Sequence, residues 1–290
     1  MRFRDSFTGY EKFEEEVWLS DEVTELDMEV AYKANRVLHY EQSPYAEISV
    51  IENKGFGRML VFDGSPQYCT RDGFIDNEML THIAMTAHPA PETIALIGGG
   101  SCGQANEVLK HPGVTKLDIV ELDQRVIEAC RYWLPNETRS LTDSRVGLTY
   151  RDGADWLNEQ TDAYDILLVD RPDPYGPALS LYRPKFYADS FRALKTDGIA
   201  VFQTGSPYYN STLLKDTVQN LSKHFPLVRT YLATIPSVPG GIWSYTLASK
   251  GIDPLQADLK QLPSESMRYL NPELYLASFV LPGYVQQLLK

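Results

Sequence analysis

The segment IGGGSCG at residues 97–103 combines residue types and a spacing that suit ligand binding. Gly98, Gly100 and Gly103 fit the pattern GxGxxG, whose glycines allow a tight turn and the close approach of a ligand to the backbone. The match is weak evidence by itself, because glycine-rich turns also join strands to helices where nothing binds. It predicts a nucleotide or nucleoside site only if further polar groups lie beside it.

Two acidic positions supply such groups at the ends of the next two predicted strands. Glu121 ends the strand that follows the glycines, where a carboxylate can accept both hydroxyl hydrogens of a ribose. One strand later come Asp152 and Gly153, where the aspartate can accept a hydrogen bond from an adenine amino group or remain solvated in a turn. Because open α/β sheets bind ligands at the carboxyl ends of their strands, the three segments predict one nucleoside site.

Two kinds of ligand are compatible with these segments, a dinucleotide and a sulfonium nucleoside. An NAD enzyme must hold a pyrophosphate, whereas a sulfonium nucleoside such as S-adenosylmethionine (SAM) needs acids around its ribose, base and cationic tail. The chain has 39 acidic residues against 27 Lys plus Arg, and its net charge of −12 favours cationic small molecules and opposes non-specific binding of nucleic acid. We therefore expect a SAM-type nucleoside, with NAD as the competing interpretation.

The elements that must position these groups fall into two parts of the chain, each with its own sequence pattern. Up to about residue 66 the pattern is that of strands, with a β-hairpin that turns at NKGFG, residues 53–57. From residue 74 strands alternate with helices, and continuous Ile/Val/Leu runs indicate a parallel sheet covered on both faces. Segments 227–235 and 242–249 are predicted strands with no helix between them, which favours an antiparallel pair closing a SAM-transferase sheet.

The predicted fold is therefore α/β, in two parts. A small N-terminal β domain is expected at residues 1–66, and a Rossmann-like, SAM-transferase-type domain at 67–290, with a mostly parallel sheet closed by the antiparallel pair. The expected helices are 74–88, 102–111 and 124–134, and the expected parallel strands are 93–97, 116–122, 146–150, 164–170 and 199–203.

Composition also bears on location and on metals. The first twenty residues lack the apolar core of a signal peptide, and no apolar run approaches the ~18–20 residues that cross a membrane. Cys69, Cys102 and Cys130 have no metal-ligand spacing, and the five histidines are scattered. We expect a cytoplasmic protein with free thiols that binds no metal, membrane or nucleic acid.

The sequence resembles the spermidine synthase family, the polyamine aminopropyltransferases, over nearly its whole length. The most specific segments are VDRPDPYGPALSLY at 169–182 and IPSVPGGIWSYTLASKG at 235–251. The resemblance implies a homodimer or homotetramer that moves an aminopropyl group from decarboxylated SAM to a small amine acceptor. The other product is then methylthioadenosine.

Family roles carry over to matching positions one residue at a time. The resemblance assigns the catalytic base to Asp170, a contact with the acceptor amine to Asp173, and a place near the acceptor channel to Gln67. A carboxylate can hold an amine that is protonated near pH 7, since its pKa is ~10.4, and can take its proton as attack begins. The expected nucleoside-binding residues are Gly98, Gly100, Ser101, Gly103, Glu121, Asp152, Gly153 and Pro177.

The departures from the family pattern lie on the donor-tail and acceptor side. Ser101 stands where the family has the carboxylate that binds the donor's terminal ammonium, Asp76 replaces a catalytic tyrosine, and Asn77 replaces a histidine or glutamine. Further departures are Ala46 for a glutamine, Val238 for a tyrosine, and Arg171 and Pro172 for the two serines of a DSSDP motif.

Two compensations for the acid lost at Ser101 remain open. Asp76 can supply a carboxylate from the other wall, or Arg171 can bind the carboxylate of intact SAM through a bidentate fork. Equally, Asp76 can be an ordinary acid at a helix N-terminus and Arg171 a solvated loop residue. The expected substrate-binding residues are Gln67, Asp76, Asn77, Arg171 and Asp173.

Three functions follow from these alternatives. The leading hypothesis is aminopropyl transfer from decarboxylated SAM to an amine. The alternative is a family member that moves an aminocarboxypropyl or methyl group from intact SAM. The second alternative is a non-enzymatic paralogue that only binds a nucleoside, although the aspartates retained at 170 and 173 favour an enzyme.

Overall fold

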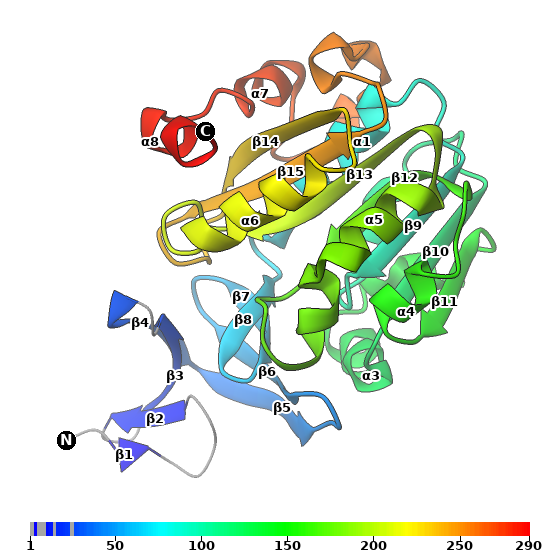
Figure 1. Ribbon diagram of the computed structural model, residues 1–290. Helices are drawn as coiled ribbons and strands as arrows, with labels where there is room; N and C mark the ends of the chain where they lie inside the picture. The colour runs from blue at the N-terminus through cyan, green and yellow to red at the C-terminus, as the bar shows by residue number, and fades with distance from the viewer. Residues whose placement is uncertain (1–2, 5–9, 14–15, 24–25) are drawn as a thin grey trace.

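The computed structural model describes residues 3–4, 10–13, 16–23 and 26–290, which form three sheets (Figure 1). Parts of the predicted N-terminal domain, at 1–2, 5–9, 14–15 and 24–25, lie outside the described residues. The two small sheets come from the N-terminal part of the chain and the third, of seven strands, from the rest. No helix in the described ranges is both long and apolar enough to span a membrane.

The two small sheets are antiparallel. The predicted hairpin is confirmed, because the strands on either side of the turn pair from Ile48↔Phe62 to Asn53↔Gly57. The last strand of the second sheet runs to Cys69, so it crosses the domain boundary expected after residue 66. The strands are β1 (Phe3–Arg4), β2 (Tyr10–Phe13), β3 (Glu16–Val23) and β4 (Met28–Ala34), then β5 (Arg36–Gln42), β6 (Glu47–Asn53), β7 (Gly57–Phe62) and β8 (Ser65–Cys69).

The large sheet has the order β11-β10-β9-β12-β13-β15-β14. The first five of these strands pair in parallel, whereas β15 is antiparallel to both of its neighbours. The predicted fold class is therefore confirmed. The strands are β9 (Thr93–Gly98), β10 (Lys116–Glu121), β11 (Val146–Tyr150), β12 (Tyr164–Asp170), β13 (Leu194–Gly205), β14 (Leu227–Thr234) and β15 (Ile242–Ser249).

Helices cover both faces of this sheet, as the apolar strands require (Figure 1). Side chains alternate between the faces along each strand, so Leu96 of β9 packs in one core while Ile97 packs in the other. The first core also contains α1, and the second contains α5. The helices are α1 (Gly73–Ala87), α2 (Gly103–Val108), α3 (Gln124–Trp133), α4 (Gly153–Leu157), α5 (Pro184–Ala193), α6 (Ser211–Leu221), α7 (Pro272–Ala277) and α8 (Gly283–Leu288), with 3-10 turns η2 (Thr138–Thr142), η3 (Gly176–Tyr182), η4 (Pro254–Gln256), η5 (Leu259–Gln261) and η6 (Ser264–Ser266).

One predicted helix is shorter than expected. The pattern predicts a helix over 102–111, but α2 ends at Val108 and the chain continues in a tight turn in which the His111 N–H donates to the Val108 carbonyl. Pro112 explains this end, because the residue before a proline disfavours the helical conformation. The helix starts one residue late because Cys102 adopts the left-handed conformation, with φ 63°.

Candidate functional site

The glycine-rich loop lies at the point where the order of the large sheet changes direction. β9 is flanked by β10 on one side and by β12 on the other, so the loops after these strands diverge from a common edge. The registers place Gly98, at the end of β9, beside Asp170, at the end of β12. Ligands of open α/β sheets bind at such a position, which supports the predicted location of the site.

Close packing accounts for the glycines of this loop. Gly98 has φ +79°, and a Cβ there would lie 1.8 Å from the carbonyl oxygen of Asp170, so no other residue fits. A Cβ at Gly103 would lie 2.2 Å from the amide nitrogen of Asn77 on α1. The pattern therefore serves the packing of the loop and α2 against α1 and β12 as well as the approach of a ligand.

Glu121 lies at the neighbouring strand end and faces the glycine loop. Its Oε1 accepts a hydrogen bond from the Asp123 N–H at 3.0 Å, and a Cβ at Gly100 would lie 3.1 Å from its Oε2. Burial raises the pKa of the Glu121 carboxyl to about 7. The carboxylate predicted for the ribose is thus half-buried beside the loop, with the nearest backbone N–H groups on its own chain segment.

The predicted adenine contact lies at the end of the next strand, β11. Oδ1 of Asp152 accepts from the N–H groups of Ala154 and Asp155 at 2.8 and 3.0 Å, so this oxygen caps helix α4. Gly153 begins that helix, and a Cβ there would lie 2.4 Å from Cγ2 of Ile97. Structural requirements therefore account for Oδ1 of the aspartate and for the absence of a side chain at Gly153.

A pair of carboxylates bridged by an amide is the centre of the site. Nε2 of Gln104, on α2, donates to Oδ2 of Asp76 and to Oδ2 of Asp170, each at 2.9 Å. Oδ1 of Asp76 also accepts from Nε2 of Gln203 at 2.9 Å and from the hydroxyl of Tyr245 at 2.6 Å. Three polar side chains from α2, β13 and β15 thus hold Asp76, a residue of α1, close to the end of β12.

The pKa values of this pair are both raised. Burial, and then the charges of Asp76 and Glu121, hold the pKa of Asp170 well above its ordinary value. Burial raises the pKa of Asp76 to about 6, against the opposing effect of its three hydrogen-bond donors. Both carboxyl groups therefore hold their protons more tightly than ordinary aspartates, and a bound cation would favour release of those protons.

Three residues of this cluster were not predicted: Gln104, Gln203 and Tyr245. Gln203 ends the predicted strand 199–203, and a polar side chain in so apolar a strand is a signal that could have been used. Gln104 directly follows the glycine pattern, and Tyr245 lies within the family-like segment at 235–251, so neither stands out by type or spacing.

The predicted role of Arg171 is wrong. Its guanidinium is buried, 2% exposed, and stacks on the ring of Tyr182 at 3.9 Å. It donates to the carbonyl oxygens of Leu181 and Gln203 at 2.7 and 3.2 Å and to the hydroxyl of Thr217 at 3.0 Å. With its donors used inside the protein, Arg171 anchors the loop after β12 and is not available for the carboxylate of a ligand; the solvated alternative is equally wrong.

The other predicted residues occupy separate places in the fold. Asn77 and Ser101 are buried beside Gly103, whose N–H donates weakly to Oγ of Ser101 at 3.4 Å. Gln67 is exposed on β8, where its amide donates to the carbonyl of Ser65. Asp173, in the loop after β12, and Pro177, at the start of η3, are both exposed.

The structure also describes the surroundings of two further departures from the family pattern, Ala46 and Val238. Ala46 is half-buried in the turn between β5 and β6, where its N–H donates to Oγ of Ser43 at 2.9 Å. Val238 is half-buried against the core on the α1 face of the large sheet. Neither side chain can donate or accept a hydrogen bond, so any contact that the family makes there is lost.

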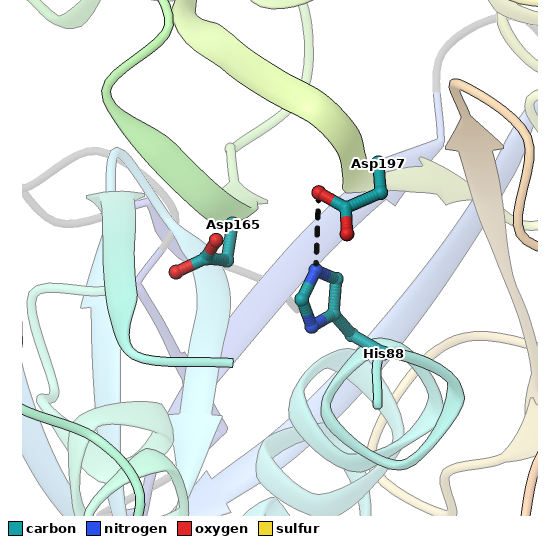
Figure 2. A group of neighbouring side chains, drawn as sticks. All are labelled: His88, Asp165 and Asp197. Atoms are coloured by element: carbon teal, nitrogen blue, oxygen red, sulfur yellow. Dashed lines mark ion pairs between the residues drawn. The ribbon is translucent and has the colours of Figure 1, made fainter. Parts of the chain in front are cut away.

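A second group of side chains has the spacing of metal ligands (Figure 2). His88, Asp165 and Asp197 each place a ligand atom within 4.8 Å of the others. However, Nδ1 of His88 accepts from the Ala90 N–H at 3.2 Å, so the ring proton lies on Nε2, the atom that faces Asp197 at 3.7 Å. Lys195 already neutralises Asp165 at 3.0 Å, and the group does not fit a metal ion.

Comparison with protein families gives two adjacent matches. Residues 73–258 match the Spermine/spermidine synthase domain, and residues 17–69 match the Spermidine synthase tetramerisation domain. The junction between the two matches falls after β8, a few residues beyond the predicted domain boundary.

Curated relatives align over nearly the full chain. A polyamine aminopropyltransferase of Moorella thermoacetica is 39% identical over 274 residues, which cover 94% of this chain and 96% of the relative. One of Caldicellulosiruptor bescii is 38% identical over 277 residues, or 96% of this chain and 99% of the relative.

Solved structures have the same fold. A spermidine synthase in complex with the transition state analogue AdoDATO superposes with a TM-score of 0.91 at 35% identity, covering 94% of each chain. The spermidine synthase of Thermotoga maritima gives a TM-score of 0.88 at 34% identity, covering 94% of this chain and 93% of that one.

Proposed function

This chain belongs to the spermidine synthase family, and we propose that it transfers an aminopropyl group from decarboxylated SAM to an amine, releasing methylthioadenosine. The observation that carries the proposal is the bridged pair of Asp76 and Asp170, at the edge of the sheet where Glu121 also lies. A cluster of buried carboxylates at a ligand-binding edge suits a substrate with several positive charges.

The nucleoside is assigned to the loops after β9, β10 and β11. In this proposal Glu121 accepts the ribose hydroxyls, and Asp152, with the backbone of Gly153, contacts the adenine. The raised pKa of Glu121 supports a carboxyl group that is poorly solvated in the free protein. Hydrogen bonds from a ribose would stabilise its anion and lower that pKa.

The chemical step is an attack by the amine on the methylene carbon bonded to the sulfonium sulfur. The nitrogen lone pair forms the new C–N bond, the C–S bond breaks, and its electron pair neutralises the sulfur. The proton lost by nitrogen passes to Asp170, which acts as general base. Asp170 must be ionised to do so, and the positive charges of the bound substrates favour that state.

The donor tail is assigned to Asp76. Ser101 carries no charge, whereas Asp76 brings a carboxylate to the end of β12 from helix α1. Leaving a buried charge without its partner typically costs ~3–5 kcal/mol, so a second acid in the same place is an effective replacement. Because Arg171 is committed inside the protein, intact SAM lacks the partner expected for its carboxylate.

Acceptor contacts and assembly complete the proposal. We assign Asp173 and Gln67 to the acceptor side, Pro177 to the nucleoside side and Asn77 to the wall between them, as the family pattern implies. The match of residues 17–69 to a tetramerisation domain supports an oligomer, and we propose a homotetramer or homodimer built through this part of the chain.

Turnover with the two donors tests the proposal. Decarboxylated SAM, incubated with a series of alkyl diamines and triamines, should give methylthioadenosine and a lengthened amine in equal amounts by mass spectrometry. Intact SAM should give neither an aminocarboxypropyl product nor a methylated one. Transfer from intact SAM alone would replace the proposal by its alternative, and tight nucleoside binding without any product would favour a non-enzymatic paralogue.

A further inference from the structure

Gln104 occupies an unusual position between the two acids of the site. Its side chain is buried, 1% exposed, and both hydrogens of its amide are used, one for each carboxylate. Among the residues that the structure describes, it is the one that bonds both Asp76 and Asp170. It is also the one described side chain that donates to the carboxylate of Asp170, and it uses Oδ2, so Oδ1 of Asp170 remains open for a ligand.

The other end of the same amide is unsatisfied. Oε1 of Gln104 is buried and has no hydrogen-bond partner in the described part of the chain. It lies beside Gly99, where a Cβ would be 3.3 Å from it and 3.0 Å from a methyl of Leu96. A buried acceptor without a donor lowers stability, so the contribution of this side chain lies in the two hydrogen bonds that it donates.

The surrounding contacts fix the amide relative to Asp76. One helical turn further along α2, Oε2 of Glu107 accepts from Nε2 of His82 on α1 at 2.8 Å. Gly103, next to Gln104, packs against Asn77, which is next to Asp76. Helices α1 and α2 are therefore joined on both sides of the bridge, which holds the amide in place beside Asp76.

We propose that Gln104 is a positioning residue for the transfer reaction: its amide spaces Asp76 from Asp170 and keeps Oδ1 of Asp170 directed to the acceptor amine. This inference rests on the proposed function. Without a donor between them, two neighbouring carboxylates share a proton through a direct hydrogen bond. Asp170 would then be turned toward Asp76 and held in its protonated form, and the reacting amine would lose its base.

The substitution Gln104→Met tests this role at nearly constant volume. We expect kcat to fall ~10²-fold or more, because general-base catalysis contributes ~10²–10⁴-fold. The acid limb of the pH–kcat profile should move to higher pH, since the hydrogen bond from Gln104 favours the anion of Asp170. Affinity for methylthioadenosine should stay near the wild-type value.

Two further variants complete the experiment. Gln104→Asn keeps an amide that is one methylene too short to bridge both acids, so it should lose kcat in the same way and serves if the methionine variant fails to fold. Gln219→Met, at an exposed position of α6, makes the same change away from the site and should match the wild type in kcat and Tm.

The outcomes separate this inference from the function on which it rests. Turnover by the wild type together with near-wild-type kcat and an unmoved pH profile in Gln104→Met would overturn the positioning role alone. A fall in Tm of the folded variant that accounts for its lost activity would also overturn it, since Gln104 would then be structural. Absence of turnover in the wild type would overturn both proposals.

Discussion

Asp76 shows how the charge of one residue can determine which donor a site accepts. In the proposed site it replaces an acid that the family has at the position of Ser101, and its carboxylate is held by Gln104, Gln203 and Tyr245. A cationic donor tail would complete this set of contacts, whereas the carboxylate of intact SAM would be repelled by it.

The substitution Asp76→Asn tests this assignment while preserving the shape of the side chain. We expect the preference for decarboxylated SAM over intact SAM to fall by roughly 10²-fold, the equivalent of one lost buried charge pair. Calorimetry with both donors on wild type and variant measures the ratio. An unchanged ratio would show that Asp76 does not bind the tail.

A second, independent prediction about a single residue concerns Glu121. Glu121→Ala removes the acceptor of both ribose hydroxyls, so affinity for methylthioadenosine should fall by ~10²-fold, as expected for hydrogen bonds to a charged group. Calorimetry with methylthioadenosine measures the change. Equal affinities in wild type and variant would remove Glu121 from the nucleoside site.

There is a physical reason why only some residues of the site could be predicted from the sequence. Glu121 and Asp170 could be predicted because both end strands that pair with β9, and strand ends are visible as the ends of apolar runs. The contacts of Gln203 and Tyr245 depend on which strands neighbour β13, and this is decided by long-range packing. The error at Arg171 has a similar cause, since composition does not reveal which side of a loop a residue turns to.

At the scale of elements, the glycine loop and β12 must approach each other closely before any ligand binds. This approach is the reason that Gly98 is essential, because its backbone is left-handed and its neighbour is the carbonyl of Asp170. The pattern of glycines could be read from the sequence, but the partner that requires the first of them could not.

The substitution Gly98→Ala should therefore destabilise the protein. The left-handed backbone alone costs a residue with a Cβ ~1–2 kcal/mol, and the contact with β12 adds to this. We expect Tm to fall by at least ~4 °C, with weaker binding of methylthioadenosine. Gly251→Ala is the matched control, since its Cβ meets nothing within 4 Å, and it should leave Tm unchanged. Equal Tm values for the two variants would contradict the packing account.

Among the features of the elements, the strand order of the large sheet was predicted from the sequence only in part. The antiparallel pair of β14 and β15 follows from two strands without an intervening helix. The insertion of β15 between β13 and β14 does not, because hairpin partners can add to a sheet from either strand. That insertion is what brings Tyr245 to Asp76.

At the scale of the whole molecule, the acidic site makes stability depend on pH. Burial raises the pKa of Glu121 to about 7 and that of Asp76 to about 6, both above their ordinary values. Groups raised in this way bind protons more tightly in the folded state than in the unfolded state. The stability that they contribute is therefore present at low pH and is lost as pH rises through the folded-state values.

We accordingly expect these carboxyl groups to add to the stability of the ligand-free protein as pH falls from about 8 to about 6, against the opposite effect of the buried His82 and His111, whose pKa values burial lowers. Each such group changes the unfolding free energy by at most ~1.4 kcal/mol per pH unit in this range. Thermal unfolding of the wild type and of Glu121→Gln across the range isolates the contribution of Glu121, which should favour the wild type increasingly as pH falls. A difference in Tm between the two proteins that does not change with pH would contradict the raised pKa of Glu121.

The central claim is that the carboxylates at the end of β12 form an amine-alkylating site with Asp170 as its base, and the substitution Asp170→Asn tests it most directly. The measurement is single-turnover transfer from decarboxylated SAM to an amine, with methylthioadenosine affinity determined in parallel. The account predicts a rate ~10²–10⁴-fold below that of the wild type, with nucleoside affinity nearly unchanged. A variant that reacts as fast as the wild type, when chemistry limits the rate, would contradict it.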